Sequence, residues 1–170
     1  MSYTKSYLLG MGIIIVLTCY PLRVAADDMV LDGGLGVFDS AKNSLSETKL
    51  LKVGIQEDLW YVLKQRFNTG FWLDNAGNGR TGSSFIGYQL GYEVKTDSLV
   101  ASAWTGPGLI SSPDSYLGGM LQFNETMFFG IHDKQDNTMG FAYNHWSSAG
   151  IEMPNQGRDF VTLQLKFPVW

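Results

Sequence analysis

The sequence predicts an all-β fold, an eight-stranded antiparallel up-and-down β-barrel that crosses a membrane. Three observations lead to this prediction. Apolar and polar residues alternate with a period of two along most of the chain after residue 26, as in strands with one apolar face. The alternating segments number eight, and single-chain barrels of the bacterial outer-membrane type have an even number of strands. Finally, long and short connections follow one another in turn, which a soluble β-sandwich gives no reason to expect.

The eight expected strands follow the period-two pattern in chain order. The fourth, from Ile86, and the eighth, from Val161, show it most clearly, because apolar side chains fall on one face and glycine or polar side chains on the other. In a membrane barrel the apolar face meets lipid and the polar, glycine-rich face lines the interior. The expected ranges are 30–40, 47–57, 59–74, 83–95, 97–107, 116–133, 138–147 and 159–169.

The connections between these strands alternate in length along the chain. The odd-numbered connections are long and polar, whereas the even-numbered ones are tight turns. An outer-membrane barrel with short periplasmic turns and long extracellular loops has this asymmetry. The long connections are 41–46, 75–82, 108–115 and 148–158, and the tight turns lie near Asp58, near Thr96 and from Lys134 to Asn137.

Residues near the strand ends define the expected membrane boundary. Aromatic residues there are assigned to the girdles that sit at the membrane surface. Pro168 interrupts the ladder of hydrogen bonds, so the final three residues, ending at Trp170, are expected to leave the strand. The aromatic residues assigned to the girdles are Trp60, Tyr61, Phe71, Trp72 and Phe85.

Residues 1–26 have the composition of a signal peptide. Lys5 precedes an apolar stretch from Tyr7 to Cys19, and small residues at Val24-Ala25-Ala26 stand where a signal peptidase cuts. The apolar stretch is shorter than the roughly 20 residues of a membrane-spanning helix. We therefore expect cleavage after Ala26, export of the chain, and one barrel domain over residues 27–170.

Composition excludes several classes of function. A formal net charge of −4 without a concentrated basic segment argues against a nucleic-acid partner. The single cysteine, Cys19, excludes an internal disulfide and a cysteine-based zinc site. His132 lies near Asp133 and Asp136, but no second histidine stands at ligand spacing from it. The sequence therefore predicts no metal site, and any chemistry rests on oxygen and imidazole groups.

Three side chains suited to acyl transfer are expected to meet on the outer face. His145 and Ser147 share a face with Tyr143, and Asp159 has the parity of the apolar residues that follow it. A hairpin of strands 138–147 and 159–169 would bring the three together. A serine hydroxyl becomes a nucleophile when a histidine accepts its proton, and a carboxylate fixes the histidine tautomer.

The spacing alone leaves two interpretations open for these residues. In the catalytic interpretation, Asn155 and backbone N–H groups of the connecting loop supply the oxyanion donors. In the other, the histidine, serine and aspartate are girdle, turn and cap residues of a barrel without activity. A motif of this kind is by itself a weak signal.

The segment His145-Trp-Ser147-Ser-Ala149-Gly150, followed by Pro154-Asn155-Gln-Gly157-Arg-Asp159, resembles the end of the lipid A 3-O-deacylase (PagL-like, acyloxyacyl hydrolase) family. That family's pattern reads approximately H-x-S-N-A-G, then N-x-G-x-E. The opening segment Gly34-Leu35-Gly36-Val37-Phe38-Asp39 is also similar to the family's first strand. The resemblance implies an outer-membrane barrel that hydrolyses an ester-linked acyl chain, expected at the 3-O position, of lipid A or lipopolysaccharide in the outer leaflet, without a cofactor.

By position in this pattern, the resemblance implies Ser147 as nucleophile, His145 as general base, and Asp159 in place of the family's glutamate. Asn155 and Gly150 match its oxyanion region, and Ser148 stands where the family has asparagine. The shorter acid and Ser148 are departures from the pattern, and they keep open a non-catalytic barrel that serves adhesion, structure or stress resistance. A secreted soluble β protein is a third alternative, and homodimer formation is left open.

Overall fold

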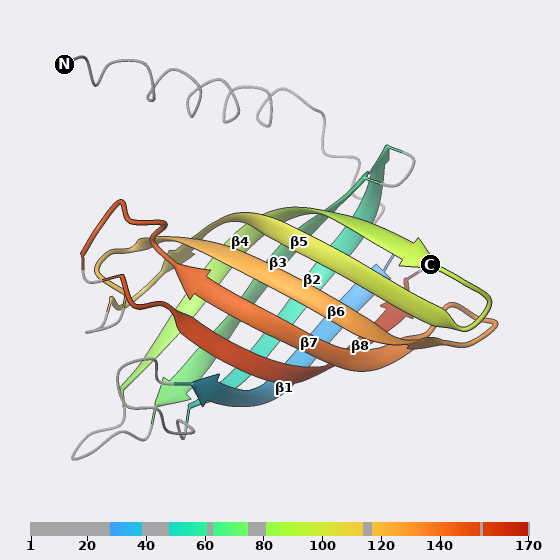
Figure 1. Cartoon of the computed structure of the whole chain (residues 1–170), viewed down its shortest axis with the longest axis horizontal. Coiled ribbons are helices and arrows are strands. Elements are labelled where there is room, and N and C mark those ends of the chain that lie inside the picture. Colours follow the sequence, from blue (N-terminus) through green and yellow to red (C-terminus); the bar gives the residue numbers. More distant parts are fainter. Residues whose placement is uncertain are drawn as a thin grey trace.

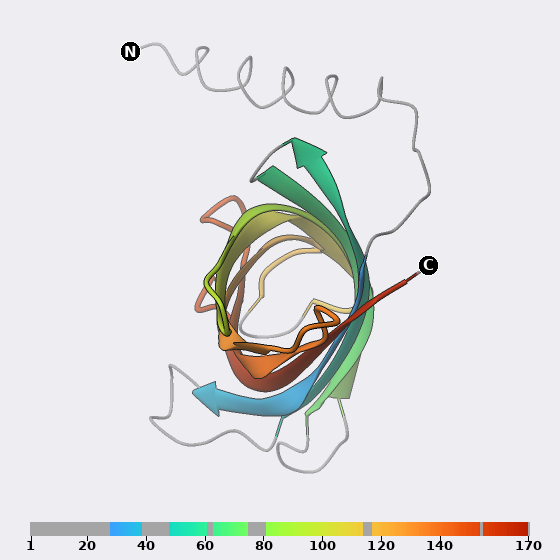
Figure 2. The same ribbon diagram turned by 90° about the vertical axis from the view of Figure 1, so that its right-hand side faces the viewer.

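The computed structural model describes residues 28–38, 48–60, 63–74, 81–113, 117–153 and 155–169. They form a closed barrel in which each strand pairs antiparallel with the next and the last pairs with the first (Figures 1 and 2). The predicted fold class is confirmed. The strands are β1 (Asp28–Phe38), β2 (Lys49–Trp60), β3 (Leu63–Asp74), β4 (Thr81–Lys95), β5 (Leu99–Ile110), β6 (Leu121–His132), β7 (Thr138–Ser147) and β8 (Arg158–Pro168).

Several expectations lie outside the described residues: the signal peptide at 1–26, Asp39, the connection at 41–46, most of the connection at 75–82, the girdle residue Tyr61, Pro154 of the β7–β8 connection, and Trp170. No helix among the described residues is long and apolar enough to cross a membrane.

The lengths of the connections confirm the expected asymmetry. Long connections at 39–48, 75–80, 111–120 and 148–157 alternate with short ones at 61–62, 96–98 and 133–137. The short turns lie at the end of the barrel where β8 finishes, and the β5–β6 and β7–β8 connections lie at the opposite end (Figure 1). We call these the short-turn end and the long-loop end.

Several strand boundaries differ from the sequence prediction. The tight turn expected near Asp58 is wrong, because the β2–β3 ladder continues through Asp58, paired with Lys64, to the pair Trp60 and Leu63. β6 begins at Leu121 rather than at residue 116, because Leu117 instead pairs with Asn155 of the β7–β8 connection. Pro168 remains in β8, paired with Asp28, where we expected the chain to have left the strand. Proline is tolerated there because it is the last residue of the strand and its missing N–H interrupts no further ladder.

The outer wall of the barrel is apolar and the interior is largely polar. This distribution contradicts the soluble alternative, in which the apolar faces would form a core, and it matches a membrane-spanning barrel. Buried interior residues include Gln89, Asn124 and Thr126, each fully buried. Apolar side chains exposed on the wall include Leu35, Leu51, Val53, Ile55, Phe67, Phe71, Leu73, Ile86, Val94, Leu99, Leu109, Met127, Phe129, Ile131, Met139, Phe141, Val161, Leu163 and Phe167.

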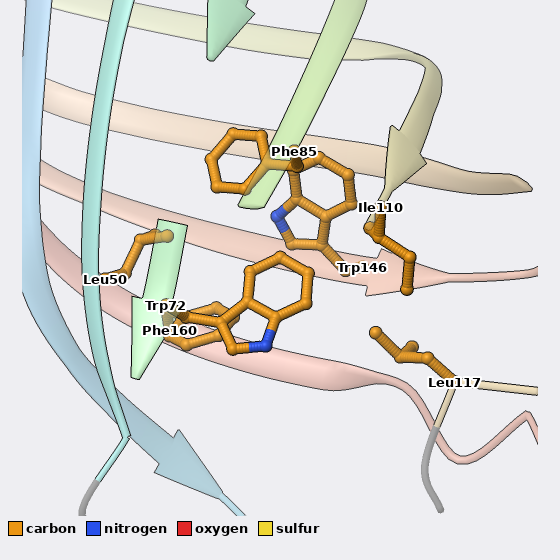
Figure 3. Close-up of a cluster of buried hydrophobic side chains, with 7 residues drawn as sticks. All are labelled: Leu50, Trp72, Phe85, Ile110, Leu117, Trp146 and Phe160. Atoms are coloured by element: carbon orange, nitrogen blue, oxygen red, sulfur yellow. The ribbon is translucent and has the colours of Figure 1, made fainter. Parts of the chain in front are cut away.

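Two of the aromatic residues assigned to the girdles lie inside the barrel. Trp72 and Phe85 are 1% and 2% exposed and stack with ring centroids 5.5 Å apart, whereas Trp60 and Phe71 do face outward. The parity of the strands explains the error, because position near a strand end does not reveal which face a residue occupies. With Leu50, Ile110, Leu117, Trp146 and Phe160 they form an aromatic plug at the long-loop end (Figure 3).

Charged side chains lie in the interior between the aromatic plug and the short-turn end, and two lysines there are paired with acidic side chains. Lys52 Nζ lies 2.7 Å from Asp32 and donates a hydrogen bond to Asn144 Oδ1 at 2.5 Å. Lys166 contacts Glu93 at 2.9 Å, and the Arg66 guanidinium lies over the Trp104 ring, 4.0 Å from its centroid. Burying a charge is costly unless it is paired, so these pairs allow a polar interior to be packed.

Lys52→Met should destabilise the barrel by about 3–5 kcal/mol, because it leaves the Asp32 carboxylate buried without its cation. Urea titration of the protein folded into lipid vesicles, followed by tryptophan fluorescence, measures the free energy of unfolding. The control is the double variant Lys52→Met/Asp32→Leu, which removes both charges and should recover most of the loss. A single variant within 1 kcal/mol of wild type would show that the pair is not needed.

Candidate active site

The pairing of β7 with β8 places His145 directly opposite Asp159. Both side chains point out of the barrel and are partly exposed, and His145 Nδ1 lies 2.6 Å from Asp159 Oδ1. A carboxylate can only accept, so Nδ1 is the donor in this contact, and in the neutral imidazole Nε2 is then the acceptor. The shorter acid therefore does reach the imidazole, because the two residues are direct cross-strand partners.

Ser147 lies two residues beyond His145 on the same outer face of β7 and is partly exposed. Among the described residues, His145 and Asp159 are joined by a hydrogen bond, and the Ser147 hydroxyl is joined to neither. Bonds between nucleophile and base are often long without substrate and tighten when it binds. The structure thus brings together two of the three residues predicted for the triad and places the third on their face.

The start of the β7–β8 connection is held by Ser148 and Asn155. Ser148 is fully buried, its backbone N–H donates to Asn155 Oδ1 at 2.8 Å, and its hydroxyl donates to the Glu152 carbonyl at 2.7 Å. Gly150 is exposed and has a φ of 77°, in the left-handed region that favours glycine. Ser148 and Asn155 therefore order the loop beside Ser147, with the Ser148 side chain directed away from the outer face.

Gly157 is a residue that the sequence analysis did not place in the site. Its φ is 77°, and a Cβ atom there would lie 2.7 Å from His145 Cε1 and 3.4 Å from Nε2. Only glycine therefore allows the backbone to pass so close to the imidazole. The sequence does indicate this position, because Gly157 ends the Asn155-Gln156-Gly157 bend two residues before Asp159.

Two further polar groups lie beside the His145–Asp159 pair. The Tyr143 hydroxyl donates to Asp159 Oδ1 at 2.5 Å. Glu125 of β6 is the cross-strand partner of His145 on its other side, and Thr105 of β5 is the partner of Glu125. Thr105, Glu125, His145 and Asp159 thus form a polar row across four strands of an otherwise apolar wall.

Interior side chains hold this part of β7 and β8 in register. Trp146 follows His145 and Phe160 follows Asp159 in the sequence, and both side chains are buried in the aromatic plug at 0% and 1% exposure. Figure 3 shows Trp146 beside Phe85, and their ring centroids are 4.7 Å apart. His145 and Asp159 are therefore each followed in the sequence by an aromatic residue that is buried on the opposite face of the sheet.

An apolar groove of about 610 Å³ runs along the outer wall. Outward-facing residues of β2 to β6 line it, including Ile55, Phe67, Tyr88 and Leu121. One of its lining residues, Pro107, pairs with Phe123, and Phe123 pairs with Ser147. The groove is thus connected to the serine along one row of cross-strand partners. No group of three or more His, Cys, Asp and Glu side chains in the described ranges could hold a metal ion.

The fold and these residues define a class: an eight-stranded membrane β-barrel that carries a histidine–carboxylate pair and a serine on its outer wall. Residues 50–168 match the sequence model of the family described as lipid A 3-O-deacylase (PagL). The chain belongs to this family.

Two individual proteins illustrate the relationship. A lipid A deacylase PagL of Bordetella bronchiseptica is 38% identical over 53 residues, which are 31% of this chain and 30% of that protein. The match therefore spans less than a third of the relative's length. The crystal structure of the outer membrane enzyme PagL superposes with a TM-score of 0.64 at 20% identity, covering 84% of this chain and 99% of the other. At this identity the superposition supports the fold.

Gly157→Ala should lower acyl-ester hydrolysis by about 100-fold, because the added methyl group forces the His145 ring away from its position, and a displacement near 1 Å has an effect of this size. The measurement is the initial rate of acyl release by the refolded protein in detergent micelles. Gly33→Ala is the matched control, since its added methyl group meets only Leu51 Cδ1 at 3.9 Å. Equal rates for Gly157→Ala and wild type would contradict the close packing.

Proposed function

We propose that this protein is a lipid A deacylase that hydrolyses an ester-linked acyl chain, at the 3-O position, of lipid A or lipopolysaccharide in the outer leaflet of the outer membrane. The observation that carries the proposal is the His145–Asp159 hydrogen bond on the outer wall, with Ser147 on the same face. Membership of the lipid A 3-O-deacylase family supplies the substrate class.

In the proposed mechanism, His145 activates Ser147. Nε2 accepts the hydroxyl proton while the Ser147 oxygen attacks the ester carbonyl, and Asp159 stabilises the imidazolium that forms. The imidazolium then gives its proton to the departing sugar oxygen, which leaves an acyl group on Ser147. Water, activated by the same imidazole, releases this group as a free fatty acid and regenerates the hydroxyl.

The loop between β7 and β8 supplies the proposed oxyanion donors. Asn155 is fixed through its Oδ1 by the Ser148 N–H, so its Nδ2 is the side-chain donor. Gly150 contributes a backbone N–H from the same loop. Donors held in place before the reaction need no reorganisation as charge develops on the carbonyl oxygen. Ser148 assists by ordering the loop rather than by contacting substrate.

The polarity of the wall supports a lipid substrate. The polar row that contains Glu125, His145 and Asp159 lies towards the long-loop end. Between this row and the short-turn end, the wall carries exposed apolar residues such as Met127 and Phe141. A lipid with its sugar at the row and its chains along the wall would present an acyl ester near Ser147. The apolar groove offers space for a chain beside that ester. With short turns in the periplasm, the site faces the outer leaflet.

Ser147→Ala should reduce deacylation by about 10⁴-fold or more, because the nucleophile is lost. The measurement is mass spectrometry of lipid A from Gram-negative cells that express each variant, with loss of one hydroxyacyl mass in the wild type. Ser98→Ala, in the exposed β4–β5 turn, is the matched control and should behave as wild type.

Heat-modifiable gel mobility verifies that each variant is folded in the membrane. A folded wild-type barrel that leaves lipid A unchanged would reject the proposed function in favour of a non-catalytic barrel. Activity retained by Ser147→Ala would instead reject Ser147 as the nucleophile.

A further inference from the structure

The Asp159 carboxylate receives two hydrogen bonds on the same oxygen atom. His145 Nδ1 lies 2.6 Å from Oδ1 and the Tyr143 hydroxyl lies 2.5 Å from it. The two donors come from the same strand, β7, and the acceptor comes from β8. Asp159 is therefore held from two directions by side chains two residues apart.

The register explains why Tyr143 reaches this carboxylate. Tyr143 is the direct partner of Val161, so Asp159 is its diagonal neighbour on β8. Diagonal neighbours are about 7–8 Å apart at the backbone, within reach of an aromatic side chain. The ring of Tyr143 is 42% exposed on the wall, and its hydroxyl points back to the polar row.

Among the described residues, the Tyr143 hydroxyl hydrogen-bonds to Asp159 and to no other group. Apart from His145, the outward neighbours of Tyr143 are apolar: Phe141 on β7 is 68% exposed, and the residues opposite are Val161 of β8 and Met127 of β6. Phenylalanine would satisfy the apolar wall as well as tyrosine does. An aromatic hydroxyl in an apolar setting needs a hydrogen-bond partner, and for Tyr143 this partner is the Asp159 carboxylate.

We propose that Tyr143 is a positioning residue: its hydroxyl fixes the Asp159 carboxylate so that this short acid holds the His145 imidazole in its working orientation. The inference rests on the proposed function. A carboxylate with one donor can rotate and release the ring, whereas two donors on one oxygen restrict it. Glu125, which faces His145 from β6, has no such hydrogen bond to the imidazole among the described residues and does not replace it.

Tyr143→Phe removes the hydroxyl and keeps the ring. We expect kcat for acyl release to fall about tenfold with KM unchanged, because Tyr143 contacts the carboxylate through a charge-assisted hydrogen bond and does not contact substrate. The assay uses the refolded full chain in detergent micelles with purified lipid A. Tyr92→Phe is the matched control, since Tyr92 is exposed on the wall of β4.

A second measurement tests the same contact without activity. The chain has two histidines, so ¹⁵N-histidine labelling gives two ring spectra, and His132→Gln identifies the signals of His145. The Nδ1 proton of His145, bonded to a carboxylate, should resonate at low field. Tyr143→Phe should move this signal, and Tyr92→Phe should leave it in place.

The two measurements separate the possible failures. Normal kcat together with an unmoved proton signal in Tyr143→Phe, while Ser147→Ala is inactive, overturns the inference and leaves the proposed function intact. An inactive, folded wild type overturns the proposed function, and the proton signal then still decides whether Tyr143 positions the pair. A rise in KM with unchanged kcat would place Tyr143 in substrate binding and so overturn the positioning role.

Discussion

The register of β7 against β8 is the constraint on which the site depends. Side chains alternate across a strand, so a slip of one residue would turn either His145 or Asp159 into the interior. Trp146 and Phe160 oppose such a slip, because each would have to leave the buried aromatic plug for the outer wall. The Asn144–Thr162 hydrogen bond inside the barrel, at 3.1 Å, opposes it as well. Packing on one face of the sheet thus specifies the chemistry on the other.

The composition of the interior and of the outer wall changes along the length of the barrel. Near the long-loop end, aromatic residues fill the interior behind the polar row of the wall. Further along, ion pairs such as Lys52–Asp32 fill the interior behind an apolar wall. The His145–Asp159 pair of the wall therefore lies in front of an aromatic interior, and ion pairs such as Lys52–Asp32 are enclosed within the barrel.

Much of this arrangement follows from the sequence by simple periodicity. Parity alone places His145, Ser147 and Asp159 outward, and the alternation of connection lengths predicts the two ends of the barrel. Trp72 and Phe85 lie near strand ends, as girdle residues do, but their place on the strands directs both side chains into the interior. The contacts of Tyr143 and Gly157 could not be read from the sequence, because they depend on a diagonal reach across two strands and on the path of a loop beside a ring.

The filled interior has a consequence for how the protein meets lipid. Fully buried side chains such as Gln89, Gln122 and Trp146 occupy the barrel at several levels, so no path leads to His145 through the interior, and under the proposed function a lipid would reach it sideways within its leaflet. Encounter is then a two-dimensional process, governed by the mole fraction of the lipid in that leaflet rather than by its concentration in solution. Under the proposed function, the released fatty acid would enter the same leaflet, so product and substrate would share one membrane surface.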